Sequence, residues 1–272
     1  MTSNTAQTGH AAVNGINLYY EIHGTGQPLV LLHGGLGAIE MFGGVLSTIA
    51  TSRQSIAVDL QAHGRTADID RPLRFETMAD DIAALIAHLG FERADVMGYS
   101  LGGGVALQTA IRHPEVVDRL ILVSTPYKRD CWYAESRAAM DQMGAATAEP
   151  MKQTPLYDAY TRIAPRPDDW ATLWAKMGDL LRQEYDWSAG VAGLTMPTLL
   201  IFGDADSVSP AHAAAFFSLL GGGQRDGSWD RSGVTPHRLA ILPGATHYDI
   251  LGAPALVPTV VSFLAEPPPA SA

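Results

Sequence analysis

A serine framed by glycines stands in the segment DVMGYSLGGG, where Gly98, Ser100 and Gly102 form a Gly-x-Ser-x-Gly pattern. A glycine-rich chain produces this pattern by chance, so its surroundings decide its meaning. Here an apolar segment, ADVMG, precedes the serine, and a helical pattern, LGGGVALQTAIRHP, follows it. A serine at a sharp strand-to-helix turn is held strained and exposed, beside N–H groups that favour negative charge. Ser100 is therefore the candidate nucleophile.

A serine hydroxyl is a weak nucleophile near neutral pH unless a histidine takes its proton and a carboxylate orients that histidine. Among nine histidines, His247 in LPGATHYDI follows the last expected strand, so its loop can reach the sheet edge that carries Ser100. Others have simpler interpretations; His88 and His113, for example, end helical patterns. His247 is the candidate base.

The segment LLIFGDADSVSP offers two carboxylates, Asp204 and Asp206, after the preceding strand. Asp204 directly follows the strand and is expected to accept hydrogen bonds from loop N–H groups. Asp206 lies further out and is better placed to reach a histidine on the next loop. We therefore expect Asp206 to be the acid.

Acyl transfer also needs N–H donors for the developing oxyanion. The segment HGGLG, residues 33–37, follows an early strand, and its glycines leave backbone N–H groups free. We expect the N–H groups of Gly35 and Leu101 to form the oxyanion hole, by analogy with a donor loop after an early strand and a donor after the nucleophile. His33 is expected to brace the loop. The alternative is that HGGLG is only a tight strand-to-helix turn.

Composition excludes several classes of protein. With 18 basic and 28 acidic residues, the net charge of −10 argues against nucleic acid or an anionic membrane surface as a partner. The single cysteine, Cys131, excludes an internal disulfide and a cysteine cluster for zinc. No metal or other cofactor is called for.

The chain of 272 residues is 47% hydrophobic, enough for a sizeable core. The start, MTSNTAQTGHAAVNG, has neither a basic leader nor an apolar stretch, and no apolar run reaches the roughly 18 residues of a membrane helix. A soluble, cytoplasmic protein is expected. The C-terminal segment EPPPASA is expected to fray.

The elements that must position these residues alternate along the chain. Apolar runs predict strands, and apolar positions at helical spacing predict helices between them. Such alternation is typical of a mostly parallel, doubly wound α/β sheet. The strands are expected over residues 16–24, 28–35, 55–60, 94–98, 119–124, 198–204 and 238–244, and the helices over 77–90, 101–114, 209–220 and up to about 264.

Residues 126–187 interrupt this alternation. Strand patterns disappear there, and four of the five tryptophans and four of the nine methionines collect. We predict a helical cap over residues 126–187, inserted into a core domain of residues 1–125 and 188–272. Its helix over 168–181 places apolar residues, Trp170 and Met177 among them, on one face.

The cap is expected to help form an apolar substrate pocket, together with residues beside the catalytic candidates. The alternative for any single cap residue is that it only packs the cap onto the core. The candidate substrate-binding residues are Leu36, Tyr99, Trp132, Tyr133, Met140, Met143, Trp170, Trp174, Met177, Val208 and Tyr248.

The chain resembles the α/β-hydrolase superfamily over residues 12–265. The segments HGGLG, DLQAHGRT, GYSLGG, GDADSVSP and GATHYD occur in the family's order. The resemblance implies the α/β-hydrolase fold, with Ser100, Asp206 and His247 as the triad in that order. The family's acid commonly stands three residues after a glycine, here Gly203, and family members often carry a helical cap after the sixth strand.

Two segments depart from the family pattern. Many relatives have an Arg-Gly-His-Gly turn where this chain has Gln61, Ala62, His63 and Gly64, a change that affects a structural turn. The loop over residues 221–237 is also longer than usual, and the sequence assigns it no role.

These observations predict a carboxylesterase-like serine hydrolase that acts on a small molecule with an apolar group. Epoxide hydrolases and haloalkane dehalogenases of this superfamily carry aspartate at the nucleophile, so Ser100 argues against both. Lactonases and carbon–carbon bond hydrolases keep the serine and remain alternatives. A non-catalytic ligand-binding protein is a further alternative. The sequence does not indicate the oligomeric state.

Overall fold

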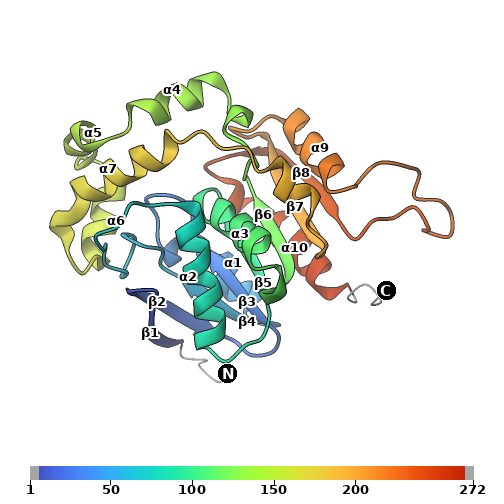
Figure 1. The fold of residues 1–272 in the computed structure, drawn as a ribbon, viewed down its shortest axis with the longest axis horizontal. Helices are drawn as coiled ribbons and strands as arrows, with labels where there is room; N and C mark the ends of the chain where they lie inside the picture. The colour runs from blue at the N-terminus through green and yellow to red at the C-terminus, as the bar shows by residue number, and fades with distance from the viewer. Residues whose placement is uncertain (1–5, 267–272) are drawn as a thin grey trace.

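The computed structural model describes residues 6–266, which contain an eight-stranded sheet in the order β1-β2-β4-β3-β5-β6-β7-β8 (Figure 1). The pairs from β4 through β8 are parallel, while β1 pairs antiparallel with β2, and β2 with β4. This confirms the mostly parallel α/β-hydrolase sheet. The strands are β1 Gln7–Val13, β2 Ile16–His23, β3 Pro28–Leu32, β4 Gln54–Val58, β5 Ala94–Tyr99, β6 Val117–Val123, β7 Thr198–Ala205 and β8 Arg238–Thr246.

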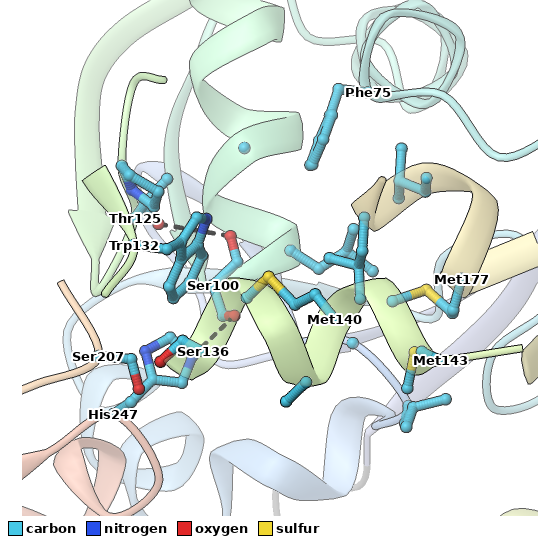
Figure 2. A pocket seen from close by; sticks show the side chains of 18 of the residues that line it. Phe75, Ser100, Thr125, Trp132, Ser136, Met140, Met143, Met177, Ser207 and His247 are labelled. Atoms are coloured by element: carbon cyan, nitrogen blue, oxygen red, sulfur yellow. Dashed lines mark hydrogen bonds between the residues drawn. The ribbon is translucent and has the colours of Figure 1, made fainter. Parts of the chain in front are cut away.

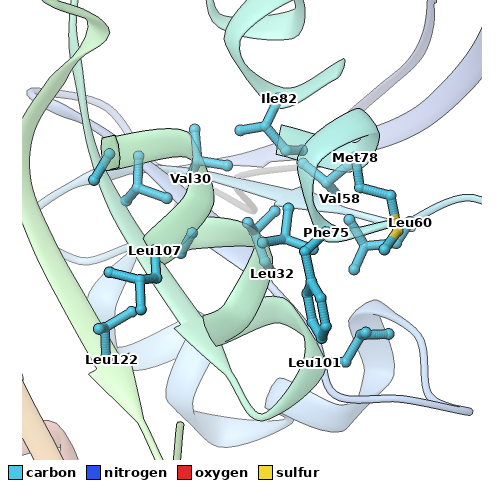
Figure 3. Packing of buried hydrophobic residues seen from close by; sticks show 14 of the residues in the cluster. Val30, Leu32, Val58, Leu60, Phe75, Met78, Ile82, Leu101, Leu107 and Leu122 are labelled. Atoms are coloured by element: carbon cyan, nitrogen blue, oxygen red, sulfur yellow. The ribbon is translucent and has the colours of Figure 1, made fainter. Parts of the chain in front are cut away.

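Helices cover both faces of the sheet, which explains the continuous apolar runs in its central strands. In β3, Val30 and Leu32 face one core cluster, while Leu29 and Leu31 face the other. Figure 3 shows the first cluster, in which side chains of β3, such as Leu32, share the core with side chains of α2 and α3, such as Phe75 and Leu107. Helices α2 Phe75–His88, α3 Leu101–Arg112 and α9 Pro210–Leu219 cover this face, and α1 Gly44–Ile49 and α10 Leu256–Ala265 cover the other.

Two elements were not expected from the sequence. Strand β1 is an edge strand whose outer residues are mostly exposed, so it lacks the apolar run that marks a buried strand. Helix α1 is only six residues long and contains no charged residue to mark an amphipathic face. Backbone pairing with β2 stabilises β1, and packing against α10 stabilises α1. Neither contact leaves a local signal in the sequence.

Between β6 and β7 the chain forms helices and no strand. In Figure 1, helices α4 to α7 form a group above and to the left of α2 and α3. An isolated backbone bridge joins Trp132 of this segment to Val208, in the loop after β7. The helices are α4 Ala134–Gln142, α5 Ala145–Met151, α6 Pro155–Ile163, α7 Trp170–Leu181 and α8 Ser188–Ala192, and the 3-10 turns of the chain are η1 Ile39–Phe42, η2 Pro114–Val116, η3 Arg129–Cys131, η4 Pro167–Asp169 and η5 Ile250–Gly252.

Residues 221–237 connect α9 to β8 and extend away from the sheet, with Trp229 fully exposed (Figure 1). Across residues 6–266, no helix combines the length and the apolar character needed to cross a membrane. Apart from Glu266, the C-terminal segment expected to fray lies outside the described residues.

Candidate active site

Ser100 occupies a sharp turn between β5 and α3. Its φ of 52° lies in the left-handed region, which is costly for a residue with a side chain. The flanking glycines allow this turn: a Cβ on Gly98 would lie 2.1 Å from the Gly102 carbonyl oxygen, and one on Gly102 would lie 2.2 Å from the Leu32 carbonyl oxygen. The glycines are therefore required by close backbone approach, and the turn places the Ser100 hydroxyl at the start of α3.

Three side chains from separate loops form a continuous chain of contacts. Ser100 Oγ lies 3.0 Å from His247 Nε2, and His247 Nδ1 lies 3.0 Å from Asp206 Oδ1. Both distances allow hydrogen bonds. The parallel sheet brings the three together, because each residue follows the carboxyl end of its strand: β5, β7 or β8.

The surroundings of Asp206 keep its carboxylate ionised. Burial alone would raise its pKa, but hydrogen bonds from His247, from the Ser124 hydroxyl and from the Gly203 N–H hold the pKa below its ordinary value. An ionised carboxylate can only accept, so His247 Nδ1 donates to Asp206 and Nε2 is left as an acceptor. In this arrangement, the Ser100 hydroxyl donates to Nε2.

Two aromatic side chains hold His247 in place. The Tyr99 hydroxyl donates to the His247 carbonyl oxygen at 2.6 Å. The Trp132 ring meets the imidazole edge to face, with centroids 5.2 Å apart. The ring and backbone of His247 are thus fixed independently of Asp206.

The loop after β3 lies against the start of α3. The Leu60 N–H donates to His33 Nε2 at 3.1 Å, so His33 Nδ1 carries the proton and donates to the Gly34 carbonyl oxygen at 2.7 Å. Burial lowers the pKa of His33 to about 4, which keeps the ring neutral. A Cβ on Gly35 would lie 3.8 Å from the Leu101 Cβ, and within residues 6–266 neither backbone N–H has a protein acceptor. Both N–H groups are therefore free to bind an oxyanion.

A cavity of about 290 Å³ opens beside Ser100 (Figure 2). Its lining within residues 6–266 contains no lysine, arginine, aspartate or glutamate. Ser136, Ser207 and His247 lie on one side of Ser100 in Figure 2, while Met143, Met177 and Phe75 lie away from it. The lining residues are Gly35, Leu36, Phe75, Ser100, Leu101, Gly104, Thr125, Pro126, Trp132, Ser136, Ala139, Met140, Met143, Met177, Leu180, Leu181, Tyr185, Ser207, His247 and Tyr248.

Six of the eleven residues expected to bind substrate line this cavity. The structure places at its wall Leu36, Trp132, Met140, Met143, Met177 and Tyr248.

Trp170 and Trp174, in the helical segment between β6 and β7, do not line the cavity, which corrects the expectation for both. Trp170 is buried between the helices of the insertion, where it contacts Tyr157 and Tyr160 and donates to the Ala148 carbonyl oxygen at 2.9 Å. Trp174 packs against Trp170 with centroids 5.6 Å apart. These residues form the core of the insertion.

Three further expectations are also corrected. Tyr99 points to the opposite face of the sheet, where its hydroxyl braces His247. Tyr133 is exposed to solvent, because it follows the inward-facing Trp132 in an extended segment. Val208 is fully buried and pairs with Trp132 through the backbone.

Sequence reasoning missed several lining residues. Phe75 begins α2 and Tyr185 follows α7, far apart in sequence, and only tertiary packing brings their rings together, with centroids 5.7 Å apart. Leu180 lies on α7 one turn after Met177, and this spacing was a usable signal. Over the described range, no group of three or more His, Cys, Asp or Glu side chains is placed to hold a metal ion.

Comparison with known proteins is decisive for the family. A sequence profile described as "alpha/beta hydrolase fold" matches residues 27–168, more than half of the chain. The chain belongs to the α/β-hydrolase fold family. The matched part contains Ser100 and the loop after β3.

Several curated relatives match less than half of this chain. A soluble epoxide hydrolase from Corynebacterium sp. (strain C12) is 36% identical over 123 residues, which are 44% of this chain and 42% of the relative. The match therefore spans less than half the length of this relative.

Solved α/β-hydrolase structures match nearly the whole chain. A thermophilic esterase from Thermogutta terrifontis has a TM-score of 0.71 at 22% identity and covers 96% of this chain and 98% of its own. An enol-lactonase from Burkholderia xenovorans LB400 has a TM-score of 0.69 at 23% identity and covers 94% and 100%. At these identities the likeness concerns the fold.

Proposed function

We propose that the protein is a serine hydrolase that cleaves a carboxylic ester through an acyl-enzyme. The observation that carries the proposal is the chain of contacts Ser100–His247–Asp206, which opens onto an apolar cavity. Ser100 attacks the ester carbonyl while His247 takes its proton, and Asp206 stabilises the imidazolium that forms. The N–H groups of Gly35 and Leu101 stabilise the oxyanion.

The second half of the reaction uses the same groups. His247 returns the proton to the leaving alcohol oxygen, which leaves Ser100 acylated. His247 then takes a proton from water as the water attacks the acyl group, and the acid is released with free Ser100.

The position of His247 orients the substrate. Because His247 protonates the leaving oxygen, the alcohol portion lies on the His247 side of Ser100, near Ser136, Ser207 and the exposed Tyr248. The acyl group then extends to the other side, toward Met143 and the remaining apolar wall. The lack of charged lining side chains favours a neutral acyl group, and the volume favours a compact one.

Residues 126–187 serve in this proposal as a cap that shapes the acyl side, while the core domain of residues 1–125 and 188–272 supplies the reacting groups. The likeness to an esterase and an enol-lactonase supports acyl transfer as the reaction class. Ser100 argues against epoxide hydrolysis, since the superfamily's epoxide hydrolases have aspartate at that position.

The proposal is tested with a fluorophosphonate probe and a panel of p-nitrophenyl esters, thioesters and lactones. Wild type is expected to be labelled at Ser100 and to cleave esters with a burst of alcohol product. Ser100→Ala is expected to lose nearly all turnover while keeping its fold and substrate binding. Absence of labelling, or a Ser100→Ala variant that keeps its activity, would exclude the acyl-enzyme. Faster cleavage of lactones than of open esters would favour a lactonase.

A further inference from the structure

Ser124 is a buried serine directly after β6, and its backbone is strained. Its φ of 51° lies in the left-handed region, and its side chain is fully buried. Ser100, at the end of the neighbouring strand β5, has almost the same φ of 52°. Non-glycine residues in this region persist only where the surrounding structure holds them, and they cluster at functional sites.

The Ser124 hydroxyl donates a hydrogen bond to Asp206 Oδ2. The other carboxylate oxygen, Oδ1, faces His247 Nδ1 at 3.0 Å. The remaining donors are longer: the Gly203 N–H lies 3.3 Å from Oδ2, and the Val208 N–H lies 3.4 Å from Oδ1. Ser124 therefore supplies the principal contact of the oxygen that His247 does not use.

The backbone fixes the direction of this contact. The Ser124 N–H donates to the Ile201 carbonyl oxygen at 2.8 Å, which ties Ser124 to β7, the strand that leads to Asp206. The strained φ turns the residue at the end of β6, where a regular strand would continue. Donor and acceptor thus sit on adjacent, directly connected strand ends.

We propose that Ser124 is a positioning residue that acts through Asp206, an inference that rests on the proposed function. Its hydroxyl prevents the carboxylate from rotating about the Cβ–Cγ bond, so that Oδ1 stays aimed at His247. It also stabilises the ionised carboxylate. Within residues 6–266, the only ion pair of this carboxylate is with His247, so no ammonium or guanidinium group in contact with it duplicates the role of Ser124.

The first test compares Ser124→Ala and Ser124→Gly. Both remove the hydroxyl, but glycine also relieves the backbone strain. We expect kcat to fall about tenfold in both variants, with little change in KM. If Ser124→Gly keeps wild-type kcat, the hydroxyl is not needed for turnover, and the proposal is overturned. Ser55→Ala is the matched control, because Ser55 is also a fully buried serine but has no hydrogen-bond partner among residues 6–266.

A double-mutant cycle separates positioning from general destabilisation. If Ser124 acts through Asp206, Ser124→Ala should lower kcat further by less than twofold in an Asp206→Asn background. An undiminished tenfold loss there would show that Ser124 acts by another route. Circular dichroism and melting curves establish that each variant is folded.

The pH profile provides a second readout. Without the Ser124 donor, the Asp206–His247 pair binds a proton more readily, so the acid limb of kcat/KM should move to higher pH in Ser124→Ala and stay in place in Ser55→Ala. If fluorophosphonate labels Ser100 in wild type but the acid limb of kcat/KM does not move in Ser124→Ala, the positioning role of Ser124 is overturned. If fluorophosphonate does not label Ser100 in wild type, the proposed function itself is refuted.

Discussion

Asp204 and Asp206 stand two positions apart at the end of β7, yet their surroundings differ. Asp206 is buried and contacts His247, whereas Asp204 is exposed and accepts a hydrogen bond from the Gly244 N–H at 2.8 Å. The contact of Asp204 ties the end of β7 to β8. The two carboxylates therefore have separate contacts, one with the histidine and one with the backbone of β8.

We expect Asp206→Asn to lower kcat by orders of magnitude, because an amide favours the wrong tautomer of His247 and cannot stabilise the imidazolium. Asp204→Asn should cost less in turnover and more in thermal stability. Matched kinetics and melting curves of the two variants provide the measurement. The reverse ranking would mean that Asp204 is the acid.

Ala62 is a second residue where local geometry makes a prediction. Its φ of 65° is left-handed, a conformation that glycine adopts more readily than alanine. Ala62→Gly should raise the free energy of unfolding by about 1 kcal/mol, because glycine adopts this conformation without strain. The control, Ala83→Gly inside α2, should lower it by a similar amount. Urea unfolding measures both, and a destabilised Ala62→Gly would contradict the strain argument.

At the residue scale, sequence reasoning succeeded where chemistry constrains short segments and failed where tertiary packing decides. The glycines around Ser100 mark the turn because only glycine tolerates the backbone approach seen at Gly98. Trp170 and Met177 share a helical face in the sequence, yet only Met177 reaches the cavity. Which part of an apolar face meets a pocket depends on helix packing, and the sequence alone does not reveal that.

At the scale of elements, α7 connects the insertion to the site. Lys176 Nζ donates to Asp68 at 2.6 Å and to the carbonyl oxygens of Ile69 and Arg71 at 2.8 Å, which anchors α7 to the core. The next residue, Met177, packs over the loop after β3, so that a Cβ on Gly35 would lie 2.8 Å from its methyl carbon. One end of α7 thus forms the cavity wall, while Trp170 at its start packs the insertion.

This division predicts different effects for two substitutions in α7. Met177→Ala enlarges the acyl side, so kcat/KM should shift toward longer acyl chains, by roughly 1 to 3 kcal/mol per methylene where the wall contacts substrate. Trp170→Ala should destabilise the protein by about 3 to 5 kcal/mol and leave the chain-length preference unchanged. Acetate to octanoate esters measure the preference at a temperature where both variants are folded. A changed preference in Trp170→Ala alone would show that the acyl group lies elsewhere.

Most elements were predictable from the sequence, because buried parallel strands and amphipathic helices have characteristic patterns. β3 is an example: all of its residues after Pro28 are buried, and it was expected as a continuous apolar run. β1 was not predictable, since it is defined by its backbone pairing with β2. Edge strands of this kind depend on their partner more than on their own residues.

At the scale of the whole molecule, three buried neutral histidines make stability depend on pH. Burial lowers the pKa of His33 to about 4, of His63 to about 3 and of His212 to about 4. In the unfolded chain each binds a proton below its ordinary pKa of about 6.5, while the folded form does not. Each histidine therefore lowers the free energy of unfolding as pH falls from 6.5 toward its folded pKa.

His212 allows this effect to be tested away from the proposed catalytic residues. Its ring stacks on Tyr127 with centroids 4.5 Å apart, and its Nε2 has no hydrogen-bond partner among residues 6–266. His212→Phe keeps an aromatic ring there and removes the titration. The slope of unfolding free energy against pH should fall by about 1.4 kcal/mol per pH unit between about pH 4 and 6.5, which makes the variant more stable than wild type at pH 5.

Urea unfolding at pH 5, 6 and 7.5 measures this slope, and the exposed His88→Gln serves as the control for loss of a histidine. The proposed esterase activity should be retained at pH 7.5 in His212→Phe, because His212 does not line the cavity. The same slope in wild type and His212→Phe would mean that His212 is protonated in the folded protein as readily as in the unfolded chain. In that case burial does not keep its ring neutral, and the acid sensitivity must come from His33, His63 or other groups.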